Sequence, residues 1–169
     1  MAIRVAVVGA KGRMGQEVCR AINSDKDLEL VAQIDLNDSL TKAVEGKADV
    51  IVDFTNATAA AKTAQFAIEN GINLVIGATG FDKKSIDEIK ELTAKNPNLG
   101  ILIAPNFAIS AVLMMQFAAT AAKYFDSAEI IEFHHPEKLD APSGTAVRTA
   151  ELMTEARESV KKPPMPDKT

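Results

Sequence analysis

The chain has 169 residues, of which 47% are apolar and 25% are charged, a balance typical of a globular protein with a hydrophobic core. Its formal net charge of −4 argues against a nucleic-acid partner, which would require a basic surface. Cys19 is the only cysteine, so no internal disulfide forms, and the apolar runs are far shorter than a membrane span. We therefore expect a cytoplasmic protein that has no membrane or nucleic-acid partner.

Short apolar runs alternate with helix-like segments through the first part of the chain. The runs predict strands at 3–8, 29–35, 50–54, 73–77 and 100–104. The segments between them predict helices at 14–22, 58–69 and 83–95. Because the strands are continuously apolar rather than alternating, we expect a parallel sheet that helices cover on both faces.

After Pro105 this alternation of strands and helices ends. A long helix is predicted at 109–123, a strand at 129–135, and a second helix at roughly 145–161 after a polar loop. We therefore place a domain boundary near Phe107. The first domain covers 1–107 and a smaller α+β domain begins at 108 and continues to 169.

A glycine-rich loop, Gly9-Ala10-Lys11-Gly12-Arg13-Met14-Gly15, lies between the first predicted strand and the first helix. Glycines there allow a tight turn and a close approach to a pyrophosphate, and the helix start offers free N–H groups. Asp35 ends the second strand, where a carboxylate accepts hydrogen bonds from ribose hydroxyls. A glycine-rich turn alone occurs in many α/β proteins. Together with Asp35 it predicts a dinucleotide-binding, Rossmann-type doubly wound parallel sheet.

Three more segments follow predicted strands: Phe54-Thr55, Gly77-Ala78-Thr79-Gly80 and Ala104-Pro105-Asn106-Phe107. Each could be only a turn. Ligands of open α/β sheets bind at the carboxyl ends of the strands, so together these segments favour a binding crevice along one edge of the sheet.

The two histidines of the chain, His134 and His135, are adjacent, and Lys138 follows closely. They could simply be polar residues at a strand end, but histidine and lysine are also proton donors in catalysis. A metal site is less favoured, because His-His followed by Glu137 lacks zinc spacing and has no cysteine nearby.

The loop after the histidines leads into the last predicted helix. Ser143 is a plausible N-cap, and Gly144 and Thr145 would then present free backbone N–H groups to an anion. A capped helix start needs no function. Two proton donors beside an anion cradle nevertheless favour the reduction of an acidic substrate.

These segments together resemble the 4-hydroxy-tetrahydrodipicolinate reductase (dihydrodipicolinate reductase) family. The resemblance covers nearly the whole chain in the family's order. It is carried by 9–15, Asp-Phe-Thr at 53–55, 77–80, 104–107 and Glu-Phe-His-His-Pro-Glu-Lys-Leu-Asp-Ala-Pro-Ser-Gly-Thr-Ala at 132–146. Two departures from the family's usual pattern are Ala78 and Ser110.

The resemblance implies that NAD(P)H reduces a small cyclic dicarboxylate, dihydrodipicolinate, to tetrahydrodipicolinate on the diaminopimelate route to lysine. His134 matches the family's proton donor and acceptor, and Lys138 its proton donor. His135, Gly144 and Thr145 match residues that bind the substrate carboxylate. The implied cofactor contacts are Gly9, Ala10, Lys11, Gly12, Arg13, Met14, Asp35, Gly77, Ala78, Thr79, Ala104, Pro105, Asn106 and Phe107.

Asp35 favours NADH, whereas Lys11 and Arg13 could hold the extra phosphate of NADPH, so we expect both cofactors to be used, with NADH at least equal. Two other functions stay open: a non-catalytic NAD-binding module, and another small nicotinamide dehydrogenase.

The strand predicted at 129–135 has no partner in the sequence, since the family's sheet continues downstream. We therefore expect the 169 residues to be the first part of a longer protein or a truncated form of it. The full-length form is expected to be a homotetramer. A 169-residue form is expected to bind NADH but to reduce dihydrodipicolinate poorly and not to form the usual tetramer.

Overall fold

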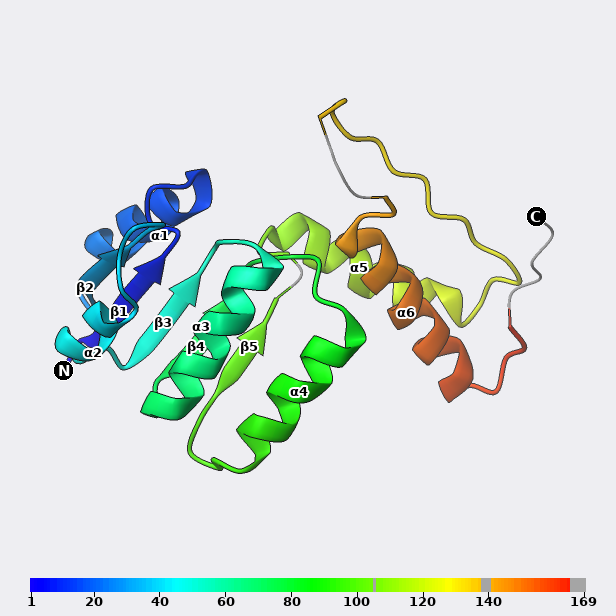
Figure 1. The fold of residues 1–169 in the computed structure, drawn as a ribbon. Helices are drawn as coiled ribbons and strands as arrows, with labels where there is room; N and C mark the ends of the chain where they lie inside the picture. The colour runs from blue at the N-terminus through cyan, green and yellow to red at the C-terminus, as the bar shows by residue number, and fades with distance from the viewer. Residues whose placement is uncertain (105, 138–140, 165–169) are drawn as a thin grey trace. The chain divides into compact units, whose positions relative to one another are not determined.

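The computed structural model describes residues 1–104, 106–137 and 141–164, and the chain divides into two compact units, Met1–Ala104 and Pro105–Thr169 (Figure 1). Unit 1 is a five-stranded sheet in the order β2-β1-β3-β4-β5, and every neighbouring pair is parallel. The strands are β1 (Ile3–Val8), β2 (Leu28–Ile34), β3 (Val50–Asp53), β4 (Asn73–Ile76) and β5 (Ile101–Ile103). The prediction of a Rossmann-type parallel sheet is confirmed. Each strand end lies within one residue of its expected position.

The strand order reverses beside β1, which lies between β2 on one side and β3 on the other. In open α/β sheets the loops at such a reversal diverge and leave a crevice at the carboxyl ends of the strands. Here the two strands that flank the reversal are β1, which leads into Gly9, and β3, which leads into Phe54. The topology therefore places the glycine loop and the Asp-Phe-Thr segment at one edge.

Helices α1 (Arg13–Ser24), α3 (Ala57–Asn70) and α4 (Lys83–Ala94) were all predicted. Helix α2 (Thr41–Glu45) was not, because it has five residues and no side-chain cap to indicate its start. Figure 1 shows α3 and α4 in front of the sheet.

Alternate residues of β1 supply two separate cores. Val5 and Val7 pack with Cys19 and Ile22 of α1, whereas Ala6 and Val8 belong to the larger core on the other face. That larger core includes Ala43 of α2, Ile89 of α4 and the small α3 residues Ala60, Ala64 and Ala67. Coverage of the sheet is less complete than predicted, since Leu102 of β5 stays 55% exposed.

Unit 2 contains α5 (Ile109–Ala122) and α6 (Gly144–Ser159), which pack against each other. Arg157 of α6 is 4% exposed and donates to the carbonyl oxygens of Ala122 at 3.2 Å, Phe125 at 2.7 Å and Pro163 at 2.7 Å. A buried guanidinium thus satisfies the last carbonyl group of α5, which accepts no hydrogen bond within that helix, and carbonyl groups of the chain that follows α5 and α6.

The strand expected at 129–135 is wrong: these residues form no strand. A strand exists only through hydrogen bonds to a neighbour, and the described residues of unit 2 contain no other strand for it to pair with. Among the described residues, no helix is long and apolar enough to cross a membrane.

Candidate functional site

The glycine loop passes directly from β1 into α1. Gly9 adopts a φ of 78°, which favours glycine, and its carbonyl oxygen accepts a hydrogen bond from Gly12 N–H at 3.0 Å. Gly12 is the N-cap of α1 and offers no side-chain acceptor to the first helical turn. The N–H groups at this helix start, where Arg13 and Met14 lie, therefore form the kind of positive end that binds phosphate.

Close backbone contacts explain why glycines occupy this edge. A Cβ atom added to Gly15 would lie 2.0 Å from the carbonyl oxygen of Gly9, and one added to Gly77 would lie 2.2 Å from the Phe54 ring. A Cβ on Gly9 would lie 3.0 Å from the Phe54 carbonyl oxygen. The segments that follow β1, β3 and β4 therefore meet in space, as the sequence predicted for one edge of the sheet.

Asp35 is held against the glycine loop. Its Oδ2 accepts a hydrogen bond from Lys11 N–H at 2.7 Å, and its Oδ1 accepts one from Leu36 N–H at 2.9 Å. These backbone hydrogen bonds, that from Leu36 first, lower the pKa of the Asp35 carboxyl below its ordinary value. The group that was predicted to receive the ribose hydroxyls is therefore ionised and beside the loop that was predicted to receive the phosphates.

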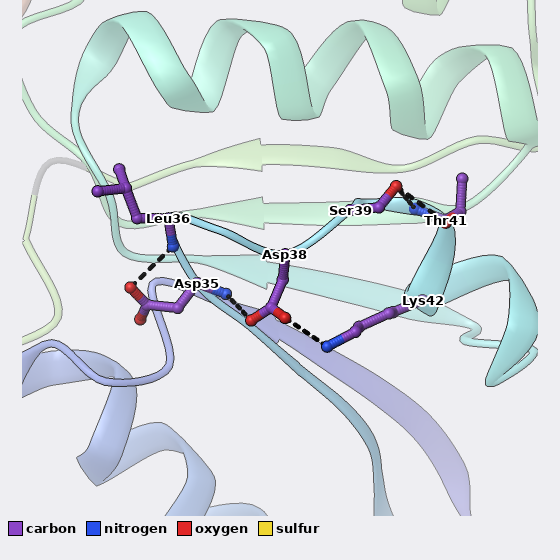
Figure 2. A network of polar contacts seen from close by, with 6 residues as sticks. All are labelled: Asp35, Leu36, Asp38, Ser39, Thr41 and Lys42. Carbon is purple, nitrogen blue, oxygen red and sulfur yellow. Dashed lines mark hydrogen bonds and ion pairs between the residues drawn. The ribbon is translucent and has the colours of Figure 1, made fainter.

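Figure 2 shows how the turn after β2 supports Asp35. The backbone N–H of Asp35 donates to Asp38 Oδ2 at 3.0 Å, and Asp38 Oδ1 pairs with the ammonium of Lys42. Lys42 is thus engaged by a carboxylate, and Leu36, beside Asp35, is 96% exposed and uncharged.

Sequence reasoning quoted Asp53 in a motif but gave it no role. Its side chain is fully buried at the end of β3, and Oδ1 accepts from both the N–H of Thr55 at 2.8 Å and its hydroxyl at 2.6 Å. Among the described residues, Asp53 Oδ2 has no hydrogen-bond partner. The signal that could have pointed to the buried Asp53 carboxylate is an acidic residue at the end of an otherwise apolar strand.

The other predicted cofactor residues differ in exposure. Ala78 is 4% exposed and belongs to the core, so its methyl group is not presented to a ligand, while Thr79 is exposed. Ala104 continues the pairing beyond β5 through a hydrogen bond from its N–H to the carbonyl oxygen of Ile76 at 3.0 Å. Pro105, predicted as a cofactor contact, lies outside the described residues.

In unit 2 the structure joins a predicted cofactor residue to a predicted substrate residue. The side-chain amide of Asn106 donates to the hydroxyl of Thr145 at 3.0 Å, and its oxygen accepts from Ala108 N–H at 2.8 Å. The neighbouring Phe107 is 46% exposed.

The start of α6 has the predicted cap, with Ser143 Oγ accepting from Ala146 N–H at 3.1 Å. Gly144 and Thr145 are the first two residues of α6. At this position the backbone N–H groups have no carbonyl acceptor within the helix and point out of its N-terminal end.

Glu132 connects this helix start to the histidine segment. One carboxylate oxygen accepts from Ser143 N–H at 2.9 Å, and the other contacts His134 Nε2 at 3.1 Å. Hydrogen bonds from Ser143, and then the one from His134, hold the pKa of the Glu132 carboxyl at about 2. Sequence reasoning missed this role of Glu132, although a carboxylate two residues before a histidine is a usable signal.

The structure does not bring all of the predicted residues of unit 2 together. His135 is exposed, and Lys138 lies outside the described residues. The described residues contain no group of three or more metal-ligating side chains.

The parallel sheet, its strand reversal and the glycine loop with Asp35 define the class: a Rossmann-type dinucleotide-binding protein with an appended second unit. Comparison with known proteins is more specific. "Dihydrodipicolinate reductase, N-terminus" matches residues 3–107 and "Dihydrodipicolinate reductase, C-terminus" matches residues 110–167. The chain belongs to the dihydrodipicolinate reductase family.

The 4-hydroxy-tetrahydrodipicolinate reductase of Corynebacterium efficiens is 52% identical over 169 residues, which are 100% of this chain and 68% of the relative. That of Mycobacterium marinum is 48% identical over 167 residues, or 99% of this chain and 67% of the relative. The dipicolinate-bound dihydrodipicolinate reductase of Paenisporosarcina sp. TG-14 is 36% identical with a TM-score of 0.76, covering 100% of this chain and 72% of that one.

A more distant likeness shows the fold alone. The myo-inositol 2-dehydrogenase of Lactobacillus plantarum is 16% identical with a TM-score of 0.57, covering 73% of this chain and 43% of that one.

The glycine contacts generate a direct prediction. Gly15→Ala places a methyl group against the Gly9 carbonyl, so the loop must shift away from its phosphate-binding form. We expect the Kd for NADH, measured by fluorescence titration, to rise by about tenfold or more, which corresponds to roughly 1.4 kcal/mol. Gly100→Ala is the matched control, because its Cβ meets an atom only at 3.4 Å. Unchanged NADH binding by Gly15→Ala would contradict the assignment of the loop.

Proposed function

We propose that this chain carries the active-site residues for NAD(P)H-dependent reduction of dihydrodipicolinate or 4-hydroxy-tetrahydrodipicolinate to tetrahydrodipicolinate, on the diaminopimelate route to lysine. Membership of the family supports this activity. The observation that carries the proposal is the cluster of Glu132, His134 and Ser143, which links a proton-exchanging side chain to the start of α6. A module that only binds NAD has no use for such a cluster.

The first unit supplies most of the proposed cofactor contacts. The N–H groups at the start of α1 would bind the pyrophosphate, and Asp35 would accept hydrogen bonds from the ribose. The remaining proposed contacts are Gly77, Ala78 and Thr79 after β4, and Ala104 to Phe107 after β5. Since the Ala78 methyl group is buried, this residue would contribute through its backbone.

The second unit supplies the chemistry around the substrate. When bound, the nicotinamide would supply a hydride to the ring, and the reaction also consumes one proton. The 4-hydroxy substrate in addition loses its hydroxyl group as water. We assign delivery of that proton to Lys138 and His134, and binding of the substrate carboxylate to His135 and the N–H groups of Gly144 and Thr145. The hydrogen bond from Asn106 to Thr145 would fix the side chain of Thr145 beside this cradle.

The two other functions considered are less well supported. A non-catalytic NAD-binding module accounts for unit 1 but leaves the cluster around Glu132 without a role. Another small nicotinamide dehydrogenase draws only on the fold, since the myo-inositol 2-dehydrogenase that matches is 16% identical.

We also propose a homotetramer for the full-length protein. The segment around the histidines leaves large apolar side chains uncovered: Ile131 is 74% exposed and Phe133 is 90% exposed. A groove of about 630 Å³, lined in part by Ile130, Ala146 and Val147, lies beside them. Surfaces of this kind usually pack against further protein.

We place the protein in the cytoplasm, where the single thiol of Cys19 stays reduced.

The proton-transfer assignment predicts a loss of turnover without a loss of folding. His134→Ala and Lys138→Ala should bind NADH normally, yet kcat should fall by about 10²–10⁴-fold, since each variant removes one positioned proton donor. The measurement is NADH oxidation with dihydrodipicolinate as substrate. Lys123→Ala, which changes an exposed lysine at the end of α5, is the control and should retain full activity. Near-normal kcat in both of the first two variants would refute the assignment.

Asp35 predicts the cofactor preference. Its carboxylate should accept the ribose hydroxyls of NADH and repel the 2′-phosphate of NADPH, while Lys11 and Arg13 offset part of that repulsion. We therefore expect both cofactors to be used, with kcat/KM for NADH at least equal. Asp35→Ala should shift the ratio toward NADPH, and Asp87→Ala, at an exposed position of α4, should leave it unchanged. A wild-type kcat/KM for NADPH about tenfold above that for NADH, roughly 1.4 kcal/mol, would show that this interpretation of Asp35 is wrong.

A further inference from the structure

We propose that Glu132 is a positioning residue that holds the His134 imidazole in a fixed place relative to the start of α6. This inference rests on the proposed function, in which His134 exchanges a proton with the substrate. Glu132 does so by using its two carboxylate oxygens for two different partners, His134 Nε2 at 3.1 Å and Ser143 N–H at 2.9 Å.

The geometry makes Glu132 a bridge between two segments of unit 2. Ser143 immediately precedes Gly144, so the oxygen bound to its N–H sits at the helix end where the substrate carboxylate is proposed to bind. The other oxygen engages the imidazole from a residue only two positions along the chain. Since the segment between Asp126 and Pro136 forms no helix or strand, its backbone alone does not fix the ring.

The contact also sets which ring nitrogen is available. With Nε2 facing the carboxylate, Nδ1 is the nitrogen left for proton exchange. Hydrogen bonds from Ser143 and His134 keep Glu132 ionised, so it acts as an acceptor through the neutral pH range. The side chains of His134 and Glu132 are 39% and 27% exposed. An ion pair with this much exposure to solvent contributes little to folding stability. We therefore expect the contact between Glu132 and His134 to orient the imidazole ring and not to stabilise the fold.

Glu132→Gln separates the two contacts. The amide oxygen of glutamine can still accept from Ser143 N–H, but the amide nitrogen donates where the carboxylate accepted, so His134 loses its acceptor. Glu129→Gln is the matched control, because it neutralises an exposed carboxylate in the same segment.

The kinetic test is NADH oxidation with dihydrodipicolinate by the full chain and both variants. We expect Glu132→Gln to lower kcat by about 10²-fold, the effect of displacing one reacting group by roughly 1 Å, with a much smaller change in KM and unchanged NADH binding. Glu129→Gln should match the wild type. Wild-type kcat in Glu132→Gln, or an increase in KM alone, would overturn the proposal.

A spectroscopic test does not depend on turnover. The ¹⁵N resonances of the two histidine rings are recorded for the three proteins, with His135→Asn used to assign them. We expect the Nε2 resonance of His134 to move in Glu132→Gln and to stay in place in Glu129→Gln. An unmoved resonance would overturn the proposal. If the wild type failed to reduce the substrate, the proposed function would fail, and the resonance would still decide whether Glu132 orients His134.

Discussion

The close packing of backbone around Gly9 is the constraint on which the cofactor site depends. The carbonyl oxygen of Gly9 leaves no room for a side chain at Gly15, and the Phe54 ring leaves none at Gly77. The first contact arises from the tight turn between β1 and α1, and the second exists because β3 and β4 are parallel neighbours whose carboxyl ends reach the same edge. As a result, the backbone of the loop lies close to its neighbours without side chains at these glycines, and Asp35 is held to the loop through the N–H of Lys11.

The two units contribute different chemistry. In the proposed function, unit 1 contributes backbone groups at helix and strand ends together with the ionised carboxylate of Asp35. Unit 2 offers titratable side chains, and its described polar contacts tie Glu132 to His134 and Asn106 to Thr145. Such a division suits a reductase, since binding a dinucleotide requires a close backbone approach, whereas proton delivery requires a group that can gain and lose a proton.

The sheet and its long helices could be predicted from sequence because their signal is local: the apolar run of β3 and the alanine-rich sequence of α3 are each visible within a few consecutive residues. Helix α2 was missed because five residues carry too little of any pattern. The strand expected at 129–135 failed because pairing is a tertiary property that its β-branched residues cannot supply. The roles of Asp53 and Glu132 were missed for a similar reason. Asp53 and Glu132 are distinguished by the N–H and hydroxyl groups that donate hydrogen bonds to their carboxylates. For Glu132 the donor is the N–H of Ser143, which lies 11 positions further along the chain.

The central claim is that this chain transfers a hydride from a nicotinamide cofactor to a small cyclic dicarboxylate. The most direct measurement is the mass of the tetrahydrodipicolinate formed by this chain from dihydrodipicolinate and NADH carrying deuterium at both C4 positions. The account predicts a product that has gained one deuterium from the cofactor. A product without deuterium, or no product from a chain that binds NADH, would contradict it.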